Sequence, residues 1–211
     1  MIRYQALFLD IGGVLLTNGW DHALRKKTAE AFQVDYDEMN SRHQLIFDTY
    51  ETGKMTLEDY LSKIIFYVKR SYSMEDVKQF IFNAARPFEE MIALMKEIKQ
   101  KHQLKVGVVS NEGKEIAIDR IKRFNLSSFV DFFIVSSFVH FRKPDPDIYK
   151  LAIDVVQVNP SSIIYIDDRA LLIDVAKQLG IQGIHHTNLE STKASLQQLF
   201  TDANPSTLFN E

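Results

Sequence analysis

Five short apolar runs, each bounded by polar residues or glycine, recur along the chain and predict buried β-strands. They occupy residues 6–9, 104–109, 132–135, 163–166 and, more weakly, 183–185. Segments with helical apolar spacing follow the second, third and fourth runs, at residues 116–124, 148–156 and 171–179. Because alternating strands and helices form right-handed crossovers between parallel strands, we expect an α/β, Rossmann-like, three-layer core with a mostly parallel sheet.

This alternation stops between residues 18 and 85, where no run is typical of a strand. Four amphipathic patterns lie there instead, at residues 22–32, 39–50, 57–68 and 74–84. Asp21, Thr56 and Ser73 stand where helix N-caps are expected. We therefore predict a small helical domain, residues 17–86, inserted into a core domain of residues 1–16 and 87–211. Pro87 is expected to start the helix that returns to the sheet.

Composition narrows the classes of function. The 211 residues carry a formal net charge of -3, which gives no basic surface for nucleic acid, and the absence of cysteine excludes disulfides and thiolate chemistry. No apolar run approaches the roughly 20 residues of a membrane span, and the first residues do not resemble a signal peptide. We expect a cytoplasmic protein with no nucleic-acid or membrane partner. Residues 201–211 are predicted to form a tail, and the oligomeric state stays open.

Polar residues follow the predicted strands at their carboxyl ends. In an open parallel sheet these ends meet at one edge, where ligands bind. The adjacent carboxylates of Asp167 and Asp168 repel each other and favour a bound cation. The candidate residues, in the order of the strands that they follow, are Asp10, Gly12 and Gly13, then Ser110 and Asn111, then Lys143, and finally Asp167 and Asp168.

Four short motifs contain these residues. They are Asp10-Ile-Gly-Gly-Val, Val109-Ser-Asn, Arg142-Lys-Pro-Asp-Pro-Asp-Ile-Tyr and Ile166-Asp-Asp. In this order they resemble the four motifs of the haloacid dehalogenase-like (HAD) hydrolase superfamily, and the resemblance covers nearly the whole chain. The helical insert lies where the helical-cap (type C1) subgroup of that superfamily has its cap, which implies that residues 17–86 close over the site.

The resemblance implies a magnesium-dependent phosphatase that acts on a small phosphorylated molecule. Asp10 would attack phosphorus and form an aspartyl phosphate that water later hydrolyses. Lys143 would neutralise the phosphate and the Asp10 carboxylate, and the Ser110 hydroxyl would hold phosphoryl oxygens. Such charge neutralisation is needed because a carboxylate and a phosphoryl group repel each other.

The resemblance also implies a set of metal ligands and phosphate-binding residues. Mg²⁺ would be bound by Asp10, the backbone carbonyl of Gly12, Asp167 and Asp168, since hard cations prefer oxygen. Gly12 and Gly13 let the backbone approach an anion closely, and Asn111 is a further binding candidate beside Ser110.

Two positions depart from the superfamily pattern. Phosphatases of the superfamily usually carry a second Asp, a general acid and base, where this chain has Gly12. Leu172 stands where an Asn or Asp is common, and Gly180 supports that register because it falls at the usual helix-ending glycine. Asp21 and His22, early in the insert, are candidates for a replacement acid.

Three functions follow from these residues. The first is a phosphatase of small phosphorylated metabolites whose leaving groups need little protonation, such as acyl phosphates or anomeric sugar phosphates. The second is a metal-independent 2-haloacid dehalogenase, which needs no leaving-group acid but leaves Asp167 and Asp168 without a role. The third is a catalytically impaired phosphate-binding or regulatory module. His185 and His186 are expected to be structural, because adjacent residues of a strand point to opposite faces.

Overall fold

The computed structural model describes residues 4–203, with a five-stranded parallel sheet at its centre. The strands are β1 (Ala6–Leu9), β2 (Lys105–Ser110), β3 (Phe132–Val135), β4 (Ile163–Asp167) and β5 (Gln182–His185). Their order in the sheet is β3-β2-β1-β4-β5, and every neighbouring pair is parallel. The predicted α/β fold is therefore confirmed. Because β1 is central, the residues that follow it lie between those that follow β2 and β4.

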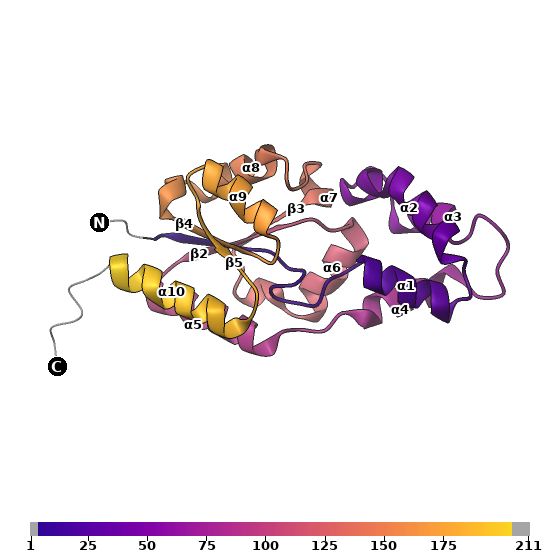
Figure 1. Ribbon diagram of the computed structural model, residues 1–211, viewed down its shortest axis with the longest axis horizontal. Helices are drawn as coiled ribbons and strands as arrows, with labels where there is room; N and C mark the ends of the chain where they lie inside the picture. The colour runs from indigo at the N-terminus through magenta and orange to yellow at the C-terminus, as the bar shows by residue number, and fades with distance from the viewer. Residues whose placement is uncertain (1–3, 204–211) are drawn as a thin grey trace.

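Helices cover both faces of the sheet, as Figure 1 shows. Leu7 and Leu9 of β1 pack with α5 (Glu89–His102) and α10 (Leu189–Ala203), whereas Ala6 and Phe8 pack with α8 (Pro146–Val156) and α9 (Ala170–Gln178). This alternation along a strand that is buried on both faces produces the three layers. The remaining core elements are α6 (Lys114–Arg123), α7 (Ser136–Val139), η1 (Leu126–Ser128) and η2 (Pro160–Ser162).

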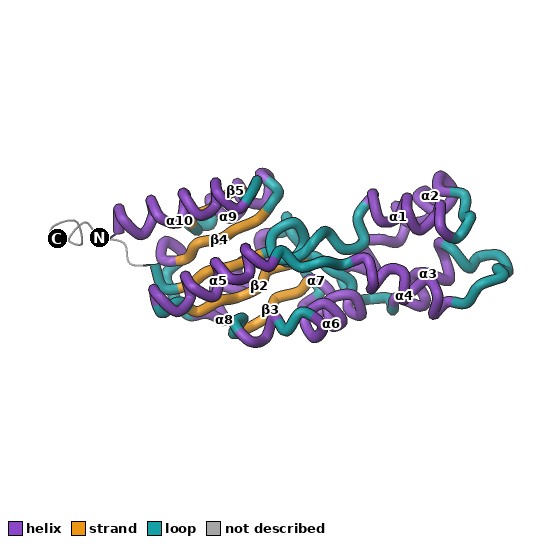
Figure 2. The backbone as a smooth tube through the Cα atoms, turned by 90° about the horizontal axis from the view of Figure 1, so that it is seen from below, coloured by secondary structure: helices purple, strands orange, loops and turns teal. Residues whose placement is uncertain are grey.

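The insert consists of four helices with an apolar core of their own. They are α1 (His22–Ala31), α2 (Tyr36–Glu51), α3 (Leu57–Ile64) and α4 (Met74–Ala84), and Figure 2 shows them grouped at one end of the molecule. Buried Met39, Tyr60 and Val77 belong to this core, which Ile116 of α6 joins to the rest of the protein. In the described part of the chain, no helix is long and apolar enough to cross a membrane.

Local capping explains where the four helices of the insert begin. The side chains of Asp21, Thr56 and Ser73 accept hydrogen bonds from backbone amides at the starts of α1, α3 and α4, as predicted. Asp35 caps α2 in the same way, so this helix begins at Tyr36, earlier than predicted. Helix α3 ends at Ile64, earlier than the apolar pattern indicated.

Ser110 is the buried last residue of β2, and α6 begins at Lys114 after Gly113. Two further predictions, those for Pro87 and for residues 201–211, are corrected by the structure. Helix α5 begins at Glu89 after Phe88, while Pro87 forms an isolated bridge with Leu16. The short α7 and the long α10 were not predicted. Residues 201–203 belong to α10 rather than to a tail, and the rest of the predicted tail lies outside the described residues.

Candidate active site

The carboxyl ends of β1, β2 and β4 bring the predicted residues together. Asp10 directly follows β1, Ser110 ends β2 and Asp167 ends β4. All three side chains are buried, and so is Lys143, which lies between β3 and α8. Parallel pairing places these strand ends at one edge, so residues far apart in the sequence form one polar cluster in an apolar core.

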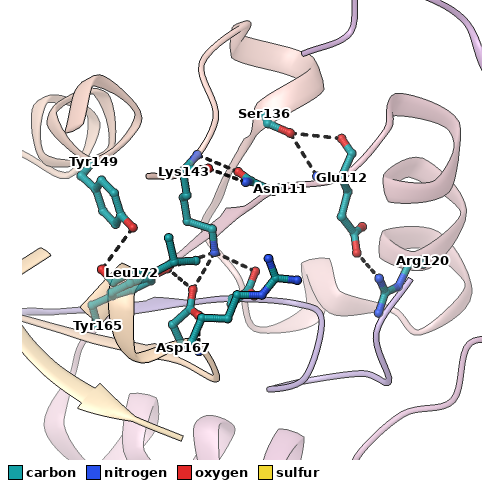
Figure 3. A network of polar contacts seen from close by, with 11 residues as sticks. Asn111, Glu112, Arg120, Ser136, Lys143, Tyr149, Tyr165, Asp167 and Leu172 are labelled. Atoms are coloured by element: carbon teal, nitrogen blue, oxygen red, sulfur yellow. Dashed lines mark hydrogen bonds and ion pairs between the residues drawn. The ribbon is translucent and has the colours of Figure 1, made fainter. Parts of the chain in front are cut away.

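Lys143 is the cation of this cluster. Its Nζ lies 3.1 Å from Oδ1 of Asp10 and 2.7 Å from Oδ2 of Asp167, and it donates to the Tyr165 hydroxyl at 3.0 Å. Figure 3 shows Lys143 pointing toward Asp167 and Tyr165. Burial by itself lowers the pKa of Lys143, but the charges of Asp10 and Asp167 outweigh it and raise the pKa above the usual value. The ammonium group therefore stays charged.

Asn111 fixes the backbone of Lys143. Its Nδ2 donates to the Lys143 carbonyl at 2.8 Å, and its Oδ1 accepts from the Lys143 amide at 2.8 Å (Figure 3). Both ends of the amide are thus used within the protein, which indicates a positioning role for this predicted binding residue. Tyr165 was missed by sequence reasoning, although a tyrosine in an otherwise aliphatic strand was a usable signal.

Asp10, Asp167 and Asp168 form an acidic cluster whose ligand oxygens all lie within 4.8 Å of one another. Asp167 is satisfied, because it also accepts from the Tyr165 hydroxyl and, at 2.8 Å, from the Arg169 amide. Among the described residues, the buried Oδ1 of Asp168 has no hydrogen-bond partner, and the buried Oδ1 of Asp10 has the ion-pair contact with Lys143. Burial raises the pKa of both carboxyl groups, as does the negative charge of their neighbours.

The residues of this cluster fit a hard divalent cation. Carboxylate oxygens are the ligands that Mg²⁺ prefers, Oδ1 of Asp168 has no partner among the described residues, and Asp168 and Asp10 repel each other. The pKa of Asp167 is instead lowered: burial opposes its charged form, but Lys143 more than compensates. Lys143 and Asp167 therefore form a fixed ion pair. The carboxylates of Asp10 and Asp168 face each other beside it, and the positive charge near them does not balance their negative charge.

At both glycine positions of the first motif, a steric contact disfavours a larger residue, and the contact differs between the two. Gly13 has a φ of +77°, and a Cβ there would overlap the carboxylate of Asp168. At Gly12 a Cβ would lie 3.0 Å from Oδ1 of Asn18. Asn18 thus occupies the space beside the position where superfamily phosphatases carry their acid. Sequence reasoning missed Asn18, because nothing in the motif marks it.

A cavity of about 260 Å³ opens from this cluster toward the insert. Asp10, Ser110 and Lys143 line it from the core, while Trp20, Arg25, His43, Phe47 and Tyr50 line it from the insert. Asp21 and His22 also reach it. Oδ1 of Asp21 accepts from the Leu24 amide at 2.7 Å, and the His22 ring packs edge-on against Tyr36. Leu172 contributes an apolar patch to the same wall.

Ion pairs of two arginines lie beside the cavity, one half-exposed and one buried. Arg142 bridges Asp48 and Glu51 at the end of α2, with 2.6 Å between its Nη2 and Oε2 of Glu51. Glu112 pairs with Arg120 (Figure 3), and burial raises the pKa of Glu112 to about 7. Neither pair was predicted, because their members meet only in the folded chain.

Both histidines after β5 have structural partners. His185 Nε2 lies 3.0 Å from the Asp168 carbonyl, and His186 Nδ1 lies 2.8 Å from the Thr192 hydroxyl. Neither belongs to the acidic cluster.

A sequence model described as haloacid dehalogenase-like hydrolase matches residues 22–185. The chain belongs to this family. The match begins after Asp10 and Gly12. The assignment of the first motif in this HAD hydrolase therefore rests on where the structure places these two residues. A phosphorylated carbohydrates phosphatase of Thermotoga maritima is 24% identical in an alignment 204 positions long, which covers 92% of this chain and 90% of the relative. An (S)-2-haloacid dehalogenase of Burkholderia cepacia is also 24% identical, over 56% of this chain and 53% of that protein.

Solved structures share the fold of this hydrolase. A HAD family enzyme from Bacteroides thetaiotaomicron, in complex with magnesium and inorganic phosphate, superposes with a TM-score of 0.72 at 20% identity. The alignment covers 86% of this chain and 93% of that enzyme.

Proposed function

We propose that this HAD hydrolase is a magnesium-dependent phosphatase of small phosphorylated metabolites and that Asp10 is its nucleophile. The observation that carries the proposal is the assembly of buried Asp10, Lys143 and Asp167 with half-buried Asp168 at one end of the cavity. A nucleophilic carboxylate needs a nearby positive charge to accept a phosphoryl group, and Lys143 supplies one that does not titrate in the neutral range.

Asp10, Asp167, Asp168 and the carbonyl of Gly12 are the residues that would hold the metal. Bound there, Mg²⁺ supplies charge neutralisation for the phosphoryl oxygens and the neighbouring carboxylates. The unpartnered Oδ1 of Asp168 supports this assignment, because a buried carboxylate oxygen is costly unless something binds it.

The reaction has two displacements at phosphorus. In the first, an Asp10 oxygen forms a bond to phosphorus while the bond to the leaving oxygen breaks, which gives an aspartyl phosphate and the released alcohol or acid. In the second, water attacks phosphorus, inorganic phosphate leaves and the Asp10 carboxylate is restored. Lys143 holds the negative charge in place, and Ser110 lies close enough to Asp10 to stabilise its charged form.

Leaving-group chemistry restricts the substrates. Gly12 offers no acid, and the neighbouring Asn18 amide cannot give up a proton at neutral pH. The hydrogen bond from the Leu24 amide fixes the Asp21 side chain to the start of α1. Asp21 can therefore serve as a replacement acid only where α1 brings it to the leaving oxygen of the substrate. We therefore expect the best turnover with acyl phosphates, anomeric sugar phosphates and aryl phosphates, which need little protonation.

The acidic cluster favours phosphatase over dehalogenase activity. A metal-independent attack on carbon gives no role to Asp168, whose carboxylate faces those of Asp10 and Asp167. The phosphatase of Thermotoga maritima also aligns over nearly the whole chain, and the dehalogenase of Burkholderia cepacia over about half of it.

A substrate panel tests the proposal. Acetyl phosphate, p-nitrophenyl phosphate and ethyl phosphate, assayed with and without Mg²⁺, should show Mg²⁺-dependent turnover that falls steeply in this order as the leaving group becomes more basic. Asp10→Asn should abolish turnover. Halide release from 2-chloropropionate without Mg²⁺ would instead identify a dehalogenase. Phosphate binding without any turnover would identify an impaired binding module.

A further inference from the structure

Arg25 is a buried cation in the insert wall of the cavity. It is 9% exposed, and one guanidinium nitrogen, Nη1, donates to the Trp20 carbonyl at 2.9 Å. Its Nε is buried and has no hydrogen-bond partner among the described residues. No carboxylate of the described residues lies within ion-pair distance of Arg25, whereas Arg142, which lines the cavity from the core, and the buried Arg120 of α6 are both paired. A buried charge without a counter-ion is costly to the fold.

The position of Arg25 in its helix adds to this cost. It lies in the first turns of α1, whose amide end carries partial positive charge, so the helix dipole disfavours a cation there. Arg169, another arginine on the cavity, lies near the carboxylates of Glu51 and Asp168, and its charge partly opposes the rise in pKa that burial causes in both. The neighbours whose pKa Arg25 perturbs, His43 and Tyr60, are neutral groups. Residues 4–203 therefore place no anion within ion-pair distance of Arg25.

His43 adds an oriented donor beside Arg25. Trp20 Nε1 can only donate, and it donates to the Tyr60 hydroxyl at 2.7 Å. Among the described residues, Nδ1 of His43, 2.6 Å away, is the acceptor within reach of the Tyr60 proton, which assigns the Tyr60 hydroxyl as the donor of this hydrogen bond. Burial and the charge of Arg25 lower the pKa of His43 to about 4, so the ring is neutral and carries its proton on Nε2. No described residue accepts from Nε2, and His43 lines the cavity.

We propose that Arg25 and His43 form a second anion-binding subsite, so that the substrate carries a carboxylate or a second phosphate besides the phosphoryl group that Asp10 attacks. This inference rests on the proposed phosphatase function for its first anion. The cavity of about 260 Å³ places both subsites in one space. It is smaller than the roughly 300–1,000 Å³ of pockets for drug-sized ligands, which favours a compact, doubly anionic metabolite.

Non-hydrolysable phosphonates test the subsite by binding alone. Phosphonoacetate and 3-phosphonopropionate carry a carboxylate, 1,2-ethylenediphosphonate carries a second phosphonate, and ethylphosphonate carries neither. We expect the wild-type protein with Mg²⁺ to bind at least one of the first three about 10- to 100-fold more tightly than ethylphosphonate, the range for hydrogen bonds to charged groups. Isothermal calorimetry measures these affinities, and the probe that is preferred distinguishes carboxylate from phosphate.

Arg25→Gln should reduce that preference to about one, and Arg25→Lys should retain part of it, because lysine keeps the charge but not the planar fork. Arg42→Gln is the matched control. Arg42 lies on the outer side of α2, paired with Glu38, and should leave the preference unchanged. Equal losses for ethylphosphonate and the dianions in Arg25→Gln, or no preference in the wild type, would overturn the subsite.

Thermal unfolding separates recognition from a structural role. Removal of a buried cation that has no counter-ion should leave the unfolding temperature of Arg25→Gln equal to or above that of the wild type. A fall of more than about 5 °C would show that Arg25 supports the fold instead. The calorimetric binding measurement needs no turnover. Selective binding of the dianions without hydrolysis of any substrate would therefore refute the phosphatase function alone. Hydrolysis without dianion preference would refute the subsite alone.

Discussion

The size of the residue at position 12 is limited by Asn18, a residue outside the motif. The Asn18 amide occupies the space into which a side chain at position 12 would extend. The backbone of Gly12 is not in the left-handed region, so steric contact with Asn18, rather than conformation, opposes a larger residue there. Gly12 and Asn18 are therefore expected to be coupled.

A double variant tests this coupling. Gly12→Asp alone should lower the free energy of unfolding by about 1 kcal/mol, because Asn18 must move to accommodate a Cβ at 3.0 Å. Gly12→Asp combined with Asn18→Ala should recover that loss and raise kcat for ethyl phosphate about 100-fold, the contribution of a positioned acid. Urea unfolding and steady-state kinetics measure the two effects. Asn18→Ala alone should show no such gain, and additive effects of the two substitutions would disprove the coupling.

His43 makes the stability of the fold depend on pH. Its pKa is lowered from 6.5 to about 4 by burial and by the charge of Arg25. Between these values the unfolded chain binds a proton that the folded protein does not. The free energy of unfolding should therefore fall as pH drops from 6.5 toward 4, by up to about 1.4 kcal/mol per pH unit for this group.

His43→Asn isolates this contribution, because the carboxylates that titrate in the same window are common to both proteins. The difference in free energy of unfolding between wild type and variant, measured in urea at several pH values, should change in favour of the wild type as pH rises from 4 to 6.5. A constant difference would mean that His43 binds a proton equally well in the folded state.

At the scale of elements, the end of α2 is fastened to the core around α7. The Ser136 hydroxyl donates to the Glu51 carbonyl at 2.7 Å and accepts from the Glu112 amide at 3.0 Å. His140 Nδ1 lies 2.8 Å from the Thr52 carbonyl. These contacts join the insert, the loop after β2 and the loop after β3, so they hold the insert over the cavity.

Two adjacent buried serines give a matched test of this fastening. Ser136→Ala leaves the Glu112 amide and the Glu51 carbonyl without their partner, which should cost about 1–3 kcal/mol of stability. Ser137 is equally buried, but its hydroxyl has no hydrogen-bond partner, so Ser137→Ala should be neutral or slightly stabilising. Chemical unfolding of the two variants provides the comparison. Equal losses would show that the hydroxyl of Ser136 adds nothing beyond its volume.

Elements with a strong local signal were predictable from the sequence. β1 and β3 have the predicted limits, and α4 begins after its predicted cap Ser73. Helix α7 was missed because four residues are too short for a helical period. The early start of α2 was missed because the capping signal of Asp35 lies before the apolar pattern begins.

The same distinction applies to the site. Strand-end residues such as Asp10 and Asp167 were found because a parallel sheet gathers them by topology. Asn18, Arg25 and Glu112 were not found, because each takes its meaning from a side chain that meets it only after folding. Residues of the insert do not follow a strand of the sheet, so their place in the sequence does not mark them as part of the site. The specificity of the cavity could therefore not be predicted before the structure was known.

At the scale of the whole molecule, the site is a concentration of negative charge between two apolar cores. Lys143 compensates Asp10 and Asp167, while Asp168 is half-buried with its pKa raised by burial and by both neighbours. The fold therefore keeps a local repulsion at the floor of the cavity. This repulsion makes the stability of the whole chain respond to cations.

Mg²⁺ should raise the unfolding temperature of the wild type, because binding to the folded state alone adds about 2.7 kcal/mol at a concentration of 100 times Kd. Asp168→Asn should be at least as stable as the wild type in EDTA, since it removes a carboxylate that faces Asp10 and Asp167, but it should lose most of the increase with Mg²⁺. Asp154→Asn, an exposed substitution on α8, makes the same change of charge away from the cluster and should keep the full increase. Differential scanning fluorimetry with and without Mg²⁺ decides between these outcomes. An equal response in all three proteins would place the cation elsewhere, because net charge alone would then explain the stabilisation.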